Sequence, residues 1–200
     1  MYHSRKEAIC LSCLEKRCCY NYTVVVTGRD IWTISRALHI PPWAFTIYGK
    51  AQEGTEAAFM LDHSGQRFEI ALAKRQGRGK KNLPCIFLWR LPDGHAQCGL
   101  GALRPVACQS YPALLVNGLL CVRNGPGCGH IWSLSELDME EELTLLEEEK
   151  QRREEYKRIV EDLNAAVLKS PEGTTLSYPE YCDYLINAYA DLYGGKSYGG

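Results

Sequence analysis

The 200-residue chain has no long apolar run. Nowhere does it approach the roughly 18 consecutive apolar residues that a membrane-spanning helix needs. Residues 1–10 are polar and carry no apolar segment of the kind found in a secretory signal. We therefore expect a cytoplasmic protein that does not enter a membrane.

Strong charge of one sign is also absent. The net charge is −1 at pH 7, so the chain has no broad positive field of the kind that bulk nucleic-acid binding requires. We see no strong nucleic-acid signal.

Several catalytic motifs are missing as well. The sequence contains no glycine-rich phosphate loop, neither G-x-x-x-x-G-K-[ST] nor G-x-G-x-x-G, and no serine nucleophile elbow. It also lacks the C-x-x-x-C-x-x-C run that initiates radical chemistry. These absences argue against familiar phosphate-loop, serine-hydrolase and radical enzymes, and they leave any enzymatic activity undecided.

Cysteine, in contrast, is plentiful, with ten residues in the chain. Because disulfides rarely persist in a reducing cytosol, a dense cysteine set there indicates metal binding or redox chemistry. The alternative is that the thiols are buried as small hydrophobic groups. That alternative suits an isolated cysteine such as Cys182, which we expect to be a core thiol. It does not suit four cysteines between residues 10 and 19.

The opening cysteines have the spacing of metal ligands. Cys10-x-x-Cys13 can place two sulfurs on one ion, because a two-residue spacer lets the loop curl around the metal. Cys18 and Cys19 are adjacent, and adjacent side chains in extended backbone point to opposite sides. The pair therefore either kinks sharply or serves two metal positions, which predicts more than one metal or two neighbouring sites.

Further along the chain, Cys85, Cys98 and Cys108 are spaced as ligands on successive strands and turns would be. Arg104 precedes Cys108 and can either donate to a thiolate or form a surface ion pair. His95 and His130 stand near candidate ligands, and we expect both to be surface or packed histidines.

These motifs resemble the YkgJ-like cysteine-cluster family, described as a zinc- or iron-chelating domain. The resemblance covers residues 8–130 and includes an acidic residue early in a helix, a C-x-F-L segment, a D-G turn before a cysteine, and R-P-x-x-C-x-x-Y-P. The family's opening C-x-x-C-x-x-C-C is two residues longer here. The matching segments are Cys10 to Cys19, Asp30, Cys85 to Leu88, Asp93-Gly94 with Cys98, and Arg104 to Pro112.

The resemblance implies a further cysteine after a hairpin, a place for which Cys121 and Cys128 compete. It also favours an iron–sulfur cluster over zinc as the cofactor, since members are labelled iron–sulfur oxidoreductases. The implied function is metal binding with a redox role. The alternatives are a zinc-stabilised interaction module and a metal-dependent protein-modifying enzyme similar to flagellin lysine methylase. The candidate metal ligands are Cys10, Cys13, Cys18, Cys19, Cys85, Cys98, Cys108, Cys121 and Cys128.

The expected fold class is α+β: a small cysteine-rich metal-binding domain with short antiparallel strands, followed by a C-terminal helical extension. A capping box of Thr27 and Asp30 predicts a helix over residues 29–40. Asn117-Gly118 between two apolar runs predicts a hairpin with a primed turn. β-branched or alternating residues predict strands at 22–27, 68–72 and 85–89.

Composition changes near residue 133, where glutamate, lysine, arginine and leucine begin to dominate. Ser133 and Glu136 form a capping box that predicts a long helix, and a second helix is predicted from residue 179 to 193. Because residues 147–155 are almost wholly polar, we expect a projecting helix or a helical hairpin. The C-terminal helices are the expected contact surface for a protein partner or for a second copy of the chain. The predicted domains are 1–132, which should fold alone, and 133–194, with 195–200 disordered.

Overall fold

A computed structural model describes residues 4–14, 16–76 and 83–194. The predicted disordered tail at 195–200 lies outside these residues. The chain forms two compact units, and each is built from two separate segments. The first, here called the cysteine unit, comprises Met1–Val24 and Ala73–Lys150, and the second, here called the tyrosine-rich unit, comprises Val25–Leu72 and Gln151–Gly200. The architecture is mixed α+β with short antiparallel strand pairs and a C-terminal helix, which confirms the coarse fold class.

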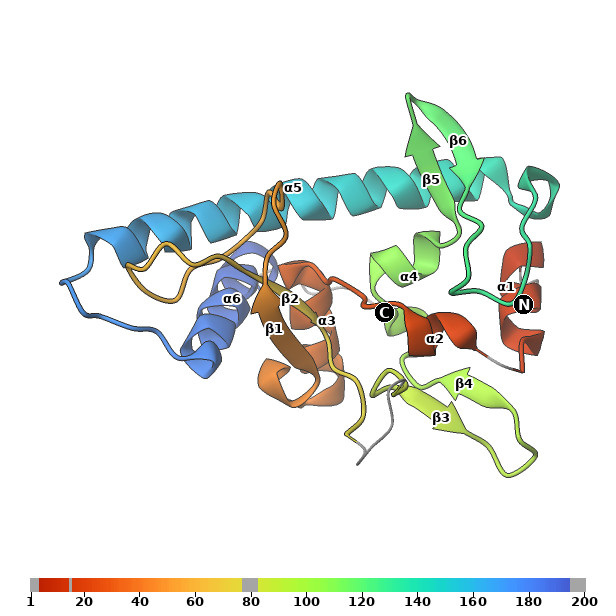
Figure 1. Ribbon diagram of the computed structural model, residues 1–200, viewed down its shortest axis with the longest axis horizontal. Helices are drawn as coiled ribbons and strands as arrows, with labels where there is room; N and C mark the ends of the chain where they lie inside the picture. The colour runs from red at the N-terminus through yellow and green to blue at the C-terminus, as the bar shows by residue number, and fades with distance from the viewer. Residues whose placement is uncertain (1–3, 15, 77–82, 195–200) are drawn as a thin grey trace. The chain divides into compact units, whose positions relative to one another are not determined.

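The cysteine unit contains all nine candidate ligands, on short elements and on the segments between them. Figure 1 shows these short elements. Its sheets are two-stranded antiparallel hairpins, β3 with β4 and β5 with β6. The elements are α1 (Arg5–Ser12), α2 (Arg17–Asn21), β3 (Leu88–Arg90), β4 (Ala96–Cys98), η2 (Gly101–Leu103), α4 (Val106–Ser110), β5 (Ala113–Val116), β6 (Leu119–Val122) and η3 (Leu134–Glu136).

The predicted hairpin around Asn117-Gly118 is confirmed. Both residues have positive φ, 52° and 78°, as a primed turn requires, and Val116 pairs with Leu119 across it. The predicted strand at 85–89 is shorter and later, because Cys85 joins Lys74 only through an isolated bridge before β3 begins.

The long helix predicted after residue 133 is present as α5 (Met139–Lys169, 31 residues), which begins later than expected. The Ser133–Glu136 capping box is present but closes the one-turn η3. α5 starts after it, and the Asp138 carboxylate accepts a hydrogen bond from the Glu141 backbone N–H at 3.0 Å. The polar stretch at 147–155 contains no fully buried residue, as its composition predicts.

The start of α5 belongs to the core of the cysteine unit. Buried Ala113, Trp132 and Leu137 form this core, and Leu146 of α5 packs against it. The division into two units therefore differs from the predicted domain boundary at residue 133. That residues 1–132 fold independently stays a prediction. The other residues packed on this core are Ile9, Cys10, Leu120, Val122 and Cys128.

The tyrosine-rich unit is built from α3 (Gly28–Leu38), η1 (Pro42–Ala44), β1 (Thr46–Lys50), β2 (Phe68–Leu72), the rest of α5, and α6 (Tyr178–Tyr193). The capping box of Thr27 and Asp30 is present, and Asp30 also forms an ion pair of 2.7 Å with Arg152. The strand predicted at 22–27 is reduced to a bridge between Val25 and Ala71, while β2 pairs along its length with β1.

Aromatic rings fill the interior of this unit. The Tyr181 ring stacks on Phe59 with centroids 3.7 Å apart, and its hydroxyl lies 2.6 Å from that of Tyr156. Cys182 is fully buried beside them, as a core thiol should be. No helix among the described residues has the length and apolar content needed to cross a membrane.

Gly28 is where this core tolerates no side chain. A Cβ there would lie 2.4 Å from the Tyr189 ring and 3.1 Å from the Tyr156 ring, and both tyrosines are buried. Alanine gains at most about 1 kcal/mol of helix propensity, whereas overpacking costs about 1–3 kcal/mol. We expect Gly28→Ala to lower the free energy of unfolding by about 1–2 kcal/mol in denaturant titrations. Gly49→Ala, with no atom within 4 Å of its new Cβ, is the control and should lose much less; equal losses would contradict the packing.

Candidate metal centre

Two short helices place the first four cysteines. α1 carries Cys10 and is followed directly by its C-cap residue Cys13, so these two thiols lie about one helical turn apart. α2 carries Cys18 and Cys19, whose sulfurs are 4.0 Å apart. All ten cysteines are free thiols.

Cys10 lies among other thiols that are distant in the sequence. Burial and the nearby Cys18 and Cys128 thiols together raise the pKa of Cys10 to about 11, against the opposing effect of Lys16 and Arg104. Cys10 and Cys128 also pack on the same apolar core. Of the two competitors for the last ligand position, it is therefore Cys128 that the fold brings to Cys10.

A second group of thiols surrounds Cys108. Burial raises the pKa of Cys108 well above its usual range, and the thiols of Cys98, Cys85 and Cys18 raise it further. Cys19 belongs to the same neighbourhood, since Cys85 and Cys98 act on its pKa too. The Cys85 backbone N–H donates to the Cys19 carbonyl at 2.8 Å, which ties the two segments together.

The adjacent pair Cys18 and Cys19 joins the two groups. A hydrogen bond between the two thiols lowers the pKa of Cys18 and raises that of Cys19, because one proton is shared between them. Cys18 acts on the pKa of both Cys10 and Cys108, while Cys85 and Cys98 act on the pKa of Cys19, so the pair lies between the two groups. That it serves two metal positions stays a prediction.

Cationic side chains surround these thiols. Lys16 and Arg104 face Cys10, and Lys74 and Arg75 act on Cys85. Lys74 is anchored by hydrogen bonds from its ammonium to the carbonyls of Cys19 and Tyr20, at 2.8 and 3.3 Å. Each of these cations lowers the pKa of the thiol it faces, which favours thiolate.

The sequence singled out only one of these cations. Arg104 forms the predicted ion pair, with Glu7 at 3.7 Å, and its charge lowers the pKa of Cys10 and Cys108. Lys16 shortly precedes the α2 cysteines in the sequence, and this closeness could have identified it as a cation of the site. Lys74 could not be recognised, since its place near Cys19 depends on a contact spanning 55 residues.

Cys128 is positioned by an aromatic pair. The rings of Tyr22 and Tyr111 lie 5.6 Å apart, and burial raises the pKa of Tyr111, with the Tyr22 hydroxyl and the Cys128 thiol adding to the rise. Tyr22 lies directly over Gly127, where a Cβ would come within 2.2 Å of its ring. The loop that presents Cys128 can thus approach Tyr22 only because residue 127 is glycine.

Gly127→Ala should therefore displace Tyr22 and loosen the loop around Cys128. We expect a loss of about 1–3 kcal/mol from overpacking and faster alkylation of Cys128 by iodoacetamide, followed by peptide mass spectrometry. Gly125→Ala is the matched control, because its new Cβ would lie 3.4 Å from the Tyr22 hydroxyl, an ordinary contact. Equal alkylation rates in the two variants would mean that Tyr22 does not hold the loop.

The remaining candidates are placed differently. Cys121 lies on β6 opposite Leu114, and Cys182 lies in the tyrosine-rich unit. His95 is beside Asp93 at 3.5 Å, and His130 contacts Glu136 at 3.1 Å, so each faces a carboxylate. Within the described ranges, no three His, Cys, Asp or Glu side chains converge closely enough to hold one metal ion.

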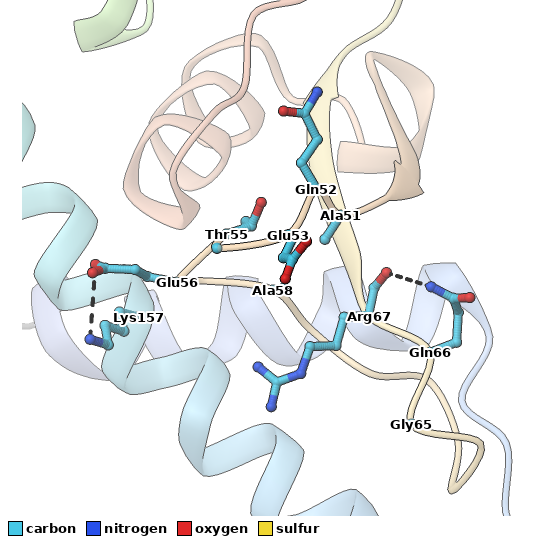
Figure 2. A pocket seen from close by; sticks show the side chains of 11 residues that line it. Ala51, Gln52, Glu53, Thr55, Glu56, Ala58, Gly65, Gln66, Arg67 and Lys157 are labelled. Atoms are coloured by element: carbon cyan, nitrogen blue, oxygen red, sulfur yellow. Dashed lines mark hydrogen bonds and ion pairs between the residues drawn. The ribbon is translucent and has the colours of Figure 1, made fainter.

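A pocket of about 720 Å³ lies in the tyrosine-rich unit and offers different chemistry (Figure 2). Glu56 and Lys157 pair across it at 3.9 Å, and Glu53 and Arg67 also line it. No cysteine is among its lining residues, so it is separate from the thiols described above.

Comparison with known proteins gave no match to a family model, a curated protein or a solved structure.

Proposed function

We propose that this chain is a metal-binding protein whose cysteine unit holds iron–sulfur cluster or zinc sites, with a redox role in the iron–sulfur case. The observation that carries the proposal is the gathering of seven thiols from segments more than 100 residues apart. They are Cys10, Cys18, Cys19, Cys85, Cys98, Cys108 and Cys128.

The donor set fits this use. Thiolates are the preferred ligands of iron–sulfur clusters and of structural zinc. Burial and the neighbouring thiols raise the pKa of Cys10, Cys85 and Cys108, an arrangement unfavourable for thiolates unless something accepts their charge. Lys16, Lys74, Arg75 and Arg104 offset part of it, and a bound metal would offset the rest. Cys13 completes the C-x-x-C pair in the proposed set.

The spacing of Cys18 and Cys19 suits two sulfurs on one metal. Their sulfurs, at 4.0 Å, approach the separation of about 3.8 Å expected for two sulfurs on one zinc with bonds of 2.3 Å. An iron that carries two cysteines needs a similar separation, so this distance does not select between the metals. The resemblance to the YkgJ-like family favours the cluster, and zinc is the alternative.

Metal analysis of protein purified without oxygen tests the proposal. Iron with matching acid-labile sulfide, and a brown colour, would establish a cluster, whereas colourless protein with stoichiometric zinc would establish the alternative. Full-length folded protein that contains neither metal, and takes up neither on reconstitution, would refute it.

A further inference from the structure

A buried ion pair connects α1 with α5 inside the cysteine unit. The Lys6 ammonium contacts the Glu142 carboxylate, and the two side chains are 8% and 0% exposed. Apart from Lys6, neither oxygen of Glu142 has a hydrogen-bond partner among the described residues. The carboxylate therefore depends on one cation for its stabilisation.

Such a pair is a poor source of stability. Burial raises the pKa of Glu142, while Lys6 lowers it, so desolvation opposes the attraction between the two charges. Apolar residues of similar size often replace a buried ion pair with no loss of stability. The placement of Lys6 and Glu142 thus calls for a role other than stabilisation.

Lys6 makes one further contact, and it leads to the thiols. Its ammonium donates a hydrogen bond of 2.8 Å to the backbone carbonyl of Gln109, the residue after Cys108. Lys6 also precedes Cys10 by one turn on α1. The same side chain is therefore linked to the helix of Cys10 and to the backbone beside Cys108.

α4, which carries Cys108, is fixed by buried Val106 and Ser110 and by polar contacts. It is only five residues long, too short to be stable alone. A second polar contact comes from the same helix as Glu142, because the Ser110 hydroxyl donates to Glu149 of α5 at 2.7 Å. α5 thus holds α4 both directly and through Lys6.

We propose that Lys6 and Glu142 are positioning residues of the thiol site. Glu142 orients the Lys6 ammonium, and the ammonium holds the backbone next to Cys108 against the helix that carries Cys10. The metal role in this inference rests on the function proposed above, whereas the positioning of Cys108 is a property of the metal-free chain as well.

The test is the full-length double variant Lys6→Met/Glu142→Leu, which keeps the volume and removes the charges and the Gln109 hydrogen bond. We expect an unchanged or higher melting temperature, together with loss of metal to a chelator about tenfold faster than in the unmodified protein. In metal-free protein, iodoacetamide should alkylate Cys108 several-fold faster, while Cys182 remains protected in the other unit. Lys157→Met/Glu56→Leu, which removes an exposed pair, is the control and should change neither rate.

The outcomes separate the two proposals. An unchanged rate of Cys108 alkylation in the double variant overturns the positioning role. The role is also overturned if Cys182 is alkylated faster to the same degree as Cys108 and the melting temperature falls, because the pair would then be purely structural. If the unmodified protein binds no metal, the proposed function fails, but alkylation still decides the positioning. If the double variant does not fold, Glu142→Gln replaces it. Loss of the charge should then speed Cys108 alkylation by a smaller factor, and an unchanged rate overturns the inference.

Discussion

Replacing Cys108 with serine is expected to remove bound metal, whereas replacing Cys182 with alanine should leave the metal content unchanged. Cys108 lies among Cys98, Cys85 and Cys18, and a hydroxyl is a far poorer ligand than a thiolate for either metal. Because metal-binding energy is folding energy in small metal domains, the Cys108→Ser protein should also melt at a lower temperature.

Cys182 is the matched control for cysteine content. It is fully buried in the tyrosine-rich unit, so alanine there removes one small apolar group at a cost of about 1 kcal/mol. Iron, zinc and sulfide would be measured in both variants, prepared side by side without oxygen. Metal lost from Cys182→Ala and kept in Cys108→Ser would show that the ligand assignment is wrong.

Truncation after residue 132 should abolish folding of the cysteine unit, contrary to the expectation from composition that residues 1–132 fold alone. The truncated chain loses Leu137 and Leu146 from the apolar core, and with them Glu142, the partner of Lys6. Burial of a leucine contributes about 2 kcal/mol, and a small domain has only about 5–15 kcal/mol in total. Losing both leucines and leaving Lys6 buried without its partner should exceed what this unit can lose.

A chain ending at Lys169 is the appropriate comparison, because it keeps all of α5 and loses α6. We expect it to retain slow alkylation of Cys108, while residues 1–132 show rapid alkylation at every thiol and no cooperative thermal unfolding. A folded, metal-containing 1–132 fragment would show that α5 is dispensable.

Local signals in the sequence predicted local structure well. The capping box of Thr27 and Asp30 and the Asn117-Gly118 turn are both present, because each depends on contacts within four residues. Alternation likewise predicted β2, Phe68–Leu72. Its partner β1 (Thr46–Lys50) was not foreseen, since TIYGK contains Gly49 and no clear alternation.

Properties that depend on distant contacts could not be predicted. The run at 22–27 has high β propensity, yet it forms only the bridge between Val25 and Ala71. In the candidate site, spacing identified the cysteines as a set, but it could not select Cys128 over Cys121. That choice depends on Cys128 packing with Cys10 on one core, more than 100 residues away in the sequence.

The interleaving of the two units has a consequence for biosynthesis. Cys10 to Cys19 leave the ribosome early, but their unit is not complete until Lys150 has been made. Because synthesis proceeds at about 5–20 residues per second, those thiols lack their final neighbours for a time on the order of ten seconds. During that interval they are exposed to oxidation and to adventitious ions, so any correct metal must be inserted late, after most of the chain has emerged.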